Sequence, residues 1–182
     1  MPPHDALHAR LAASADAPAL GDLMRLAIGE MQKGFLTPAQ IESSRAVMGL
    51  DTQLIADQTY FMVETQRRIA GCGGWSRRNT LYGGDHSSGR SPRLLDPASE
   101  PARVRAMYTH PDFGLRGVGR LILSLCEAAA AAEGFTAVEL AATLSGEPLY
   151  LACGYVPVER FEDARGGIPV PLIRMRKALV AR

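Results

Sequence analysis

Lysine is scarce in this sequence, and a large excess of either charge is missing. Only Lys33 and Lys177 are lysines, so 18 of the 20 basic residues are arginines. Against 19 acidic residues they leave a net charge of +1, which argues against a general binder of nucleic acids or anionic membrane surfaces. The arginine excess has two explanations: a bias in genomic base composition, or the use of some arginines to bind phosphate through the guanidinium fork.

Features of metal centres, disulfides and membrane spans are also missing. The three cysteines form no CxxC pair and lie in apolar stretches, so we expect reduced thiols in the core. The four histidines show no metal-ligand spacing with them. Residues 1–10 contain no apolar segment of a signal peptide, and no apolar run approaches the roughly 18 residues of a membrane span. We therefore expect a soluble, cytoplasmic protein that binds no metal.

What is present fits a globular protein. Hydrophobic residues make up 47% of the 182 residues and charged residues 21%, which is ordinary for a soluble domain. A globule of this length buries roughly 70% of its unfolded surface, so its core needs no metal or disulfide. We expect residues 1–182 to form a single domain.

The hydrophobic periodicity predicts a mixed α/β (α+β) fold. Apolar residues at helical spacing follow Asp16, a candidate N-cap, and Pro18 in the first turn. Further helices are expected at residues 37–48, 118–134 and 147–152. Strands are expected at 7–13, 60–65, 69–75, 103–109, 137–142, 155–161 and 170–178, the second and third forming a hairpin. Residues 79–100 are rich in Gly, Ser, Pro and Asp and predict a long loop that is either mobile or functional.

A glycine-rich turn connects the strand at 103–109 to the helix at 118. Gly114, Gly117 and Gly119 would let a phosphate approach the free amides of the helix start, with Arg116 and Arg120 beside it. The alternative is a tight strand-to-helix turn that binds no ligand. The glycine order differs from the Rossmann fingerprint, and there is no Gly-Lys-Ser/Thr of a P-loop.

Charge around this turn is locally one-sided. Four arginines occur between Arg103 and Arg120, and the acidic residue among them is Asp112. We therefore expect a local excess of positive charge that suits one small anionic cofactor.

Three blocks of this sequence resemble the GCN5-related N-acetyltransferase (GNAT) superfamily. Residues 114–119 are similar to its acyl-CoA signature Gln/Arg-x-x-Gly-x-Gly/Ala, and residues 108–112 match the Tyr-x-His-Pro-Asp form that often precedes it. Residues 149–155 are similar to its Leu-Tyr-x-x-x-Gly-Phe/Tyr block, and residues 175–179 to its last strand. The order and spacing of the blocks agree with the family.

The resemblance covers residues 55–180 well and residues 1–54 by pattern. The chain departs from the family in three places: Gly114 stands where Gln or Arg is usual, Thr143 where Asn is frequent, and Pro148 shortens the last helix.

The resemblance implies a GNAT-like fold, with a mostly antiparallel central sheet, splayed fourth and fifth strands and flanking helices. It implies acetyl-CoA as co-substrate, its pantetheine arm lying along the backbone of Met107 and Thr109 like an added strand. Tyr150 would be the general acid that protonates the leaving thiolate, or would merely pack against the sulfur. The cofactor-binding residues implied by the resemblance are Met107, Tyr108, Thr109, Leu115, Arg116, Gly117, Val118, Gly119, Arg120, Thr143 and Tyr150.

The activity implied is acetyl transfer to a primary amine of a small molecule, a peptide or a protein. The general base stays open between Glu64, Glu139, His110 and water, and Met31 and Phe35 are candidates for the acceptor groove. The absence of an obvious base leaves a second interpretation, a non-catalytic acyl-CoA-binding or regulatory module. We expect no nucleic-acid or membrane partner, and a homodimer is compatible with the sequence.

Overall fold

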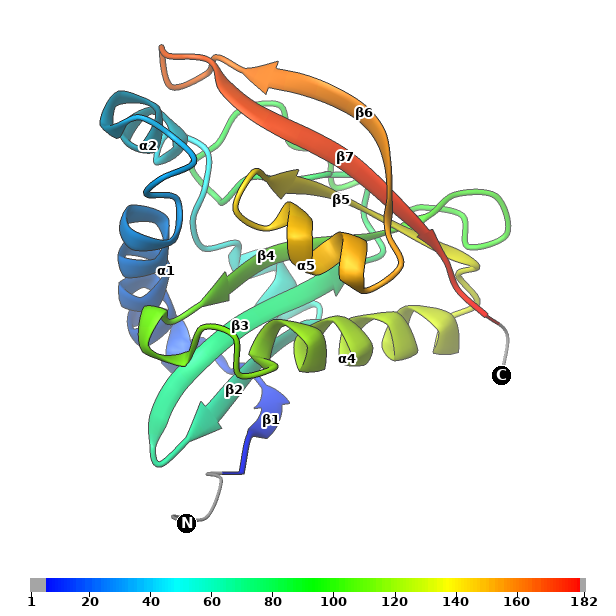
Figure 1. Cartoon of the computed structure of the whole chain (residues 1–182). Helices are drawn as coiled ribbons and strands as arrows, with labels where there is room; N and C mark the ends of the chain where they lie inside the picture. The colour runs from blue at the N-terminus through cyan, green and yellow to red at the C-terminus, as the bar shows by residue number, and fades with distance from the viewer. Residues whose placement is uncertain (1–5, 181–182) are drawn as a thin grey trace.

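Seven strands form one sheet in the computed structural model, which describes residues 6–180 (Figure 1). The strands are β1 (His8–Leu11), β2 (Tyr60–Thr65), β3 (Arg68–Ser76), β4 (Ala102–Thr109), β5 (Ala137–Thr143), β6 (Val156–Asp163) and β7 (Val170–Ala178). The helices are α1 (Ala17–Met31), α2 (Pro38–Ser44), α3 (Thr52–Ala56), α4 (Val118–Ala132) and α5 (Glu147–Ala152), with 3₁₀ turns η1 (Ser14–Asp16) and η2 (Pro111–Phe113).

The strand order across the sheet is β1-β2-β3-β4-β5-β7-β6. Neighbouring strands run antiparallel except β4 and β5, which pair in parallel at Ala102–Val138 and Arg103–Glu139. The mixed, mostly antiparallel fold predicted from the sequence is confirmed. Because the parallel pairing stops at Arg103, the remainder of β4 and of β5 separate from each other, as Figure 1 shows.

Helices cover both faces of the sheet. One core cluster packs α4, through residues such as Ile122 and Cys126, against Val63 of β2. A second packs α1, through residues such as Leu20, against Met62 of the same strand. Adjacent residues of a strand point to opposite faces, so α1 and α4 lie on opposite sides of the sheet (Figure 1). The sheet is therefore covered by α1 on one face and by α4 on the other.

Two details near the N-terminus differ from the sequence prediction. The Asp16 carboxylate does not cap α1, because it accepts the Ala13 amide at 2.7 Å and pairs with Arg10 at 2.8 Å. The first strand is shorter than predicted and spans His8–Leu11.

The second predicted helix is also shorter, and one helix was missed. α2 ends at Ser44 and is followed by a turn at residues 45–47. α3 has five residues, too few for periodicity to show, and begins with Asp51 accepting the Gln53 amide at 3.0 Å.

The three cysteines are free thiols, with Cys72 and Cys126 buried. Burial raises the pKa of Cys72 to about 12, so this thiol stays protonated. Among the helices of residues 6–180, none is long and apolar enough to cross a membrane. The ends of the predicted 1–182 domain lie outside the described residues.

Candidate active site

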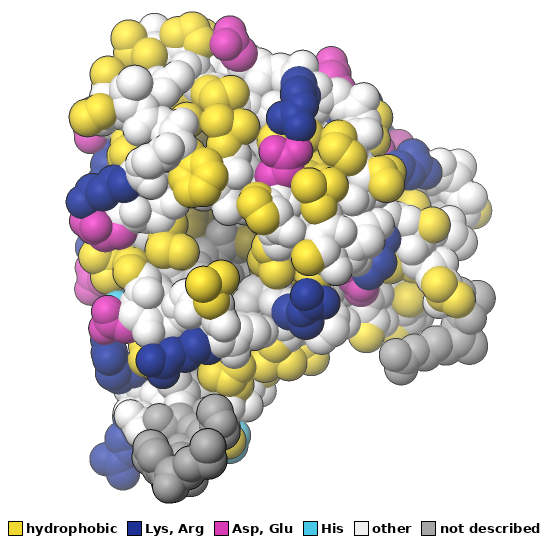
Figure 2. All heavy atoms as spheres, viewed as in Figure 1, with side chains coloured by type: hydrophobic (Ala, Val, Ile, Leu, Met, Phe, Trp, Pro, Cys, Tyr) yellow, Lys and Arg dark blue, Asp and Glu magenta, His cyan; other side chains and the backbone are white. Residues whose placement is uncertain are grey.

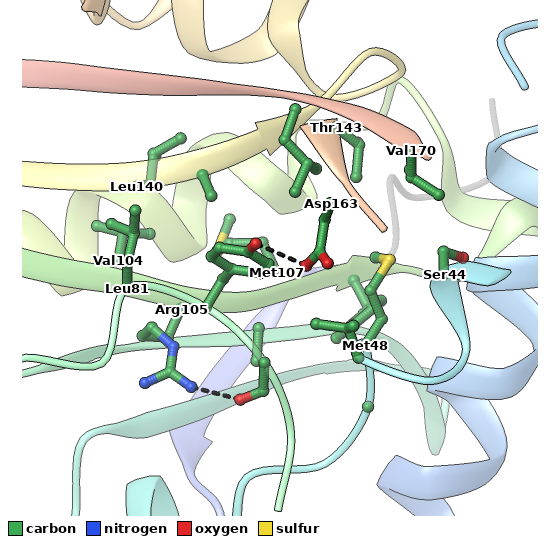
Figure 3. Close-up of a pocket in the computed structure, with 18 of the residues that line it drawn as sticks. Ser44, Met48, Leu81, Val104, Arg105, Met107, Leu140, Thr143, Asp163 and Val170 are labelled. Carbon is green, nitrogen blue, oxygen red and sulfur yellow. Dashed lines mark hydrogen bonds between the residues drawn. The ribbon is translucent and has the colours of Figure 1, made fainter. Parts of the chain in front are cut away.

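A cavity opens where β4 and β5 part (Figure 3). Residues 104–108 of β4 form one wall, and Leu140, Ala141 and Thr143 of β5 face them. Tyr150 of α5 also lines the cavity. Since β5 leaves β4 after Arg103, the backbone groups of β4 on this side are free of a strand partner, and a ligand with amide groups can pair with them as an added strand.

β4 carries a bulge within this wall. Gly74 lies opposite Arg105 and Cys72 opposite Tyr108, so two residues of β4, Ala106 and Met107, face the single Gly73. Ala106 adopts a φ of +50°, a conformation that costs an L-residue about 1–3 kcal/mol. A Cβ at Gly73 would meet the side chains of Met107 and Ile122, so a larger residue there would force both to move. The bulge turns the backbone of the strand at the point where the cavity begins.

The glycine-rich turn forms the N-terminus of α4, a helix of 15 residues. Gly117 is its N-cap with φ of +83°, and no atom of residues 6–180 lies within 4 Å of the place where a Cβ would stand. Leu115 and Arg116 are exposed, and the Arg116 guanidinium lies 5.5 Å from the centre of the Phe113 ring. The first amides of α4 therefore face open space beside a cation, an arrangement that suits an anion.

Tyr150 is buried, and its ring meets Tyr155 edge-on at 5.8 Å. Burial raises the pKa of its phenol, which keeps the group in the proton-donating form at neutral pH. Thr143, at the same end of the cavity, accepts the Gly146 amide at 3.1 Å through Oγ1. Its hydroxyl thus also fixes the turn between β5 and α5.

Comparison with known proteins identifies the family. A family model described as "Acetyltransferase (GNAT) domain" matches residues 56–157. This chain belongs to the GNAT superfamily. No curated protein matches the chain.

Solved structures share the GNAT fold across nearly the whole chain. A GCN5-related N-acetyltransferase from Rhodopseudomonas palustris aligns with a TM-score of 0.69 and 17% identity, covering 96% of each chain. The paiA N-acetyltransferase from Thermoplasma acidophilum, solved with coenzyme A, has a TM-score of 0.65 and 12% identity, with 95% and 99% covered. The putative acetyltransferase yncA from Salmonella typhimurium, solved with acetyl-CoA, has a TM-score of 0.62 and 16% identity, with 98% and 96% covered.

The cavity between β4 and β5 is lined by some of the predicted site residues and not by others. Met107, Tyr108, Thr143 and Tyr150 line it. Thr109 follows at the end of β4, and residues 115–120 form the turn and first residues of α4.

The three side chains considered as a base lie elsewhere. Glu64 accepts from Arg10 at 3.1 Å, and Glu139 is paired with Arg103 at 2.8 Å. His110 accepts the Asp112 amide through Nδ1 at 3.1 Å. None of these three side chains lines the cavity.

Met31 and Phe35 do not line the cavity either. Their side chains lie at the end of α1 and beyond it, 37% and 51% exposed.

The sequence predicts a local excess of positive charge between Arg103 and Arg120. For two of the four arginines, Arg103 and Arg105, this prediction is wrong. Arg103 is neutralised by Glu139 and Arg105 by Asp51, each at 2.8 Å. Both partners are far away in the sequence, so counting charges along the segment could not reveal them. Arg116 and Arg120 remain as the two arginines beside the helix start.

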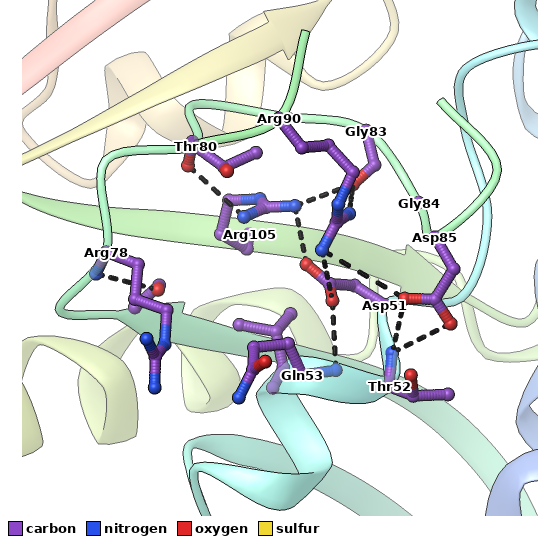
Figure 4. Close-up of polar contacts among 12 residues, drawn as sticks. Asp51, Thr52, Gln53, Arg78, Thr80, Gly83, Gly84, Asp85, Arg90 and Arg105 are labelled. Atoms are coloured by element: carbon purple, nitrogen blue, oxygen red, sulfur yellow. Dashed lines mark hydrogen bonds and ion pairs between the residues drawn. The ribbon is translucent and has the colours of Figure 1, made fainter. Parts of the chain in front are cut away.

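The loop between β3 and β4 is anchored to the sheet (Figure 4). Arg105 of β4 donates to the carbonyl oxygens of Thr80 at 3.2 Å and Gly83 at 2.6 Å. Arg90 donates to the Gly83 carbonyl at 3.0 Å and to the Asp51 carboxylate at 2.9 Å. The sequence left open whether this loop is mobile or functional. Its contacts to Arg105 and Arg90 hold it in place, and Leu81, Tyr82 and Gly83 line the cavity. Both observations favour a functional loop.

The opposite side of the cavity was not foreseen from the sequence. Its residues come from the end of α2 and the segment after it, from the loop at 81–83 and from the hairpin of β6 and β7. Tyr82 donates its hydroxyl to Asp163 Oδ2 at 2.6 Å, across 81 residues of sequence (Figure 3). Figure 2 shows hydrophobic side chains gathered around a hollow on this face.

Proposed function

We propose that this protein is an acetyl-CoA-dependent N-acetyltransferase that transfers the acetyl group directly to a primary amine of a small molecule, a peptide or a protein. The observation that carries the proposal is the cavity between β4 and β5, where the free edge of β4 and Tyr150 face one another. Membership of the GNAT superfamily agrees with it.

The residues present fit acetyl-CoA. The amides of residues 115–120 would hold the pyrophosphate, with Arg116 and Arg120 beside it, since α4 begins there and space above Gly117 is open. The backbone of Met107 and Thr109 would pair with the pantetheine arm, and Tyr108, Thr143 and Tyr150 would surround the thioester end. Acetyl-CoA would supply the acetyl group as a thioester.

In the transfer, the acceptor nitrogen forms a bond to the acetyl carbon while the carbon–sulfur bond breaks. Tyr150 would give its proton to the departing sulfur. Its phenol is neutral at pH 7, and burial, by raising its pKa, keeps it neutral but weakens it as an acid. The proton leaving the amine would go to water, because Glu64, Glu139 and His110 stand outside the cavity.

The position of these three candidate bases outside the cavity favours a second candidate, a non-catalytic acyl-CoA-binding module. Thermal unfolding with and without acetyl-CoA tests what the two candidates share, and a rise in Tm is expected for both. Thiol release with a panel of amines separates them. Tight binding without release on any amine would reject the transferase.

We further propose that residues 1–182 act as a single domain in the cytoplasm, without a metal, nucleic acid or membrane partner. A homodimer is compatible with this proposal, and sedimentation analysis would test it.

A further inference from the structure

The acceptor side of the cavity is built from three segments that hold one another in place. Ser43 donates its hydroxyl to the Ile168 carbonyl at 2.6 Å, which ties the end of α2 to the β6–β7 hairpin. The Gly84 amide donates to the Val47 carbonyl at 2.8 Å and ties the loop to the segment after α2. These contacts give the wall a defined shape before an acceptor arrives.

The wall is mainly apolar. Val47, Met48, Leu81, Val170 and Leu172 contribute side chains to it. An alkyl or aryl group placed among them leaves water at a gain of about 25 cal/mol per Å² of buried apolar surface.

Two charged side chains of the described residues line the cavity, Arg105 and Asp163, and both already have partners. Arg105 is paired with the Asp51 carboxylate and with two carbonyl oxygens. Its Nε lacks a partner among residues 6–180, but this atom is buried, so an acid group cannot reach it without moving the wall. A carboxylate or phosphate on the acceptor would lose its hydration here without gaining a cation.

Asp163 is held by Arg165, whose Nη2 lies 2.7 Å from Oδ2. Although burial opposes its ionisation, hydrogen bonds from Arg165 and Tyr82 lower the pKa of Asp163 to about 2. The carboxylate is therefore ionised, too weak a base to deprotonate an ammonium, and already neutralised by Arg165.

The hydroxyls of Ser43 and Ser44 on this wall donate to the carbonyls of Ile168 and Ile41. Tyr82 adds a phenol that can recognise an amine. Burial first, and then its hydrogen bond to Asp163, raise the pKa of Tyr82 to about 12, so the phenol stays neutral. Its proton is directed to Asp163, and Arg165 also hydrogen-bonds to the phenolic oxygen, so one lone pair of that oxygen is left for an N–H donor. Arg165 lies beside the ring, with its guanidinium carbon 5.0 Å from the ring centre, and its charge is balanced by Asp163.

We propose that the acceptor is a small primary amine that carries an apolar group and no acidic group, and that Tyr82 accepts a hydrogen bond from its nitrogen. This inference rests on the proposed acetyltransferase function. It narrows the acceptor from primary amines in general to apolar monoamines, and it makes Tyr82 a specificity-determining residue.

Matched acceptor pairs test the inference: 2-phenylethylamine against phenylalanine, and 3-methylbutylamine against leucine. The members of each pair differ by one carboxylate. We expect kcat/KM of thiol release to be at least about tenfold higher for each amine than for its amino acid. Equal or faster reaction of the amino acids would overturn this inference and leave the acetyltransferase proposal intact. Thiol release with none of a wider amine panel would overturn both.

Two substitutions at the wall sharpen the test. Leu81→Arg places an unpaired cation on the half-buried loop. It should raise kcat/KM for phenylalanine relative to 2-phenylethylamine by about tenfold, whereas Leu81→Gln, the uncharged control, should not.

Tyr82→Phe keeps the ring, which packs 5.9 Å from Phe161, and removes the hydroxyl. It should raise the KM for 2-phenylethylamine about fivefold, with kcat and the Kd of acetyl-CoA little changed. An unchanged KM in a folded Tyr82→Phe protein would remove Tyr82 from recognition.

Discussion

Arg105 and Asp51 form an ion pair inside the protein: Nη2 lies 2.8 Å from Oδ2, and each side chain is 2% exposed. Burial lowers the pKa of Arg105, and the Asp51 carboxylate opposes this effect. The same guanidinium holds the carbonyl of Gly83, so a buried charge of the sheet fixes the loop that lines the cavity. The shape of the acceptor side thus depends on Asp51, a residue that does not itself line the cavity.

Replacing Asp51 by asparagine should therefore be strongly destabilising, because it leaves the buried Arg105 charge without its counter-ion. We expect a loss of about 3–5 kcal/mol in the free energy of unfolding, measured by urea denaturation. Asp22→Asn is the control, since the Asp22 side chain is 73% exposed, and it should change stability by less than about 0.5 kcal/mol. The double variant Asp51→Leu with Arg105→Met should be more stable than Asp51→Asn alone. A double variant that is less stable would contradict this account.

Gly114 offers a route to tighter cofactor binding. Its φ of −58° and ψ of 145° suit any L-residue, and the nearest atom to a Cβ there is the Pro111 oxygen at 3.5 Å. Gly114→Arg should add a cation beside the start of α4, lower the Kd for coenzyme A about three- to tenfold and raise stability by about 0.4–1 kcal/mol. Calorimetric titration and thermal unfolding measure the two effects.

The matched control is Gly117→Arg. Its charge is the same, but at a φ of +83° the arginine backbone would be held in the left-handed region, at a cost of about 1–3 kcal/mol. This variant should be less stable than the parent protein. If both variants weakened coenzyme A binding equally, the helix start would not be the pyrophosphate site.

Much of the fold could be predicted because its signals are local. The helix Glu147–Ala152 and the strand Val170–Ala178 have the predicted bounds, since glycines and alternating apolar residues mark their ends. α3 escaped prediction because five residues span less than two helical turns.

The candidate site divides in the same way. Tyr150 and the glycines of residues 114–119 lie in contiguous motifs, so sequence alone draws attention to them. The pairs Asp51–Arg105 and Tyr82–Asp163 join residues 54 and 81 positions apart, and only the packed fold brings each pair together. Arg105 in particular sits in a strand whose alternation gives no sign that a buried carboxylate will face it.

Tyr150→Phe tests the proposed acid. Removal of the hydroxyl should lower kcat by about 10²–10⁴-fold, with the Kd of acetyl-CoA little changed, because the ring still packs against Tyr155. Any loss of kcat at high pH in the parent protein that reflects ionisation of this phenol should vanish in the variant. Tyr155→Phe is the control, since its hydroxyl donates to Glu127 at 3.0 Å and does not line the cavity. A Tyr150→Phe enzyme with an unchanged pH profile and kcat would assign the residue to packing alone.

Asp163 should make the stability of the protein sensitive to acid. Its folded-state pKa of about 2 lies below the ordinary value of 3.8, so the ionised carboxylate stabilises the native state fully above pH 3.8, and this contribution is lost as the pH falls toward 2. Asp163→Asn should cost stability at pH 7, and the difference from the parent protein should shrink between pH 4 and pH 2 in urea denaturation. Tyr82→Phe removes one hydrogen bond to the carboxylate and should move the midpoint of that loss toward 3.8. If the two proteins differed by the same free energy of unfolding over this whole pH range, Asp163 would titrate alike in the folded and unfolded chains. Its pairing with Arg165 would then contribute nothing to acid stability.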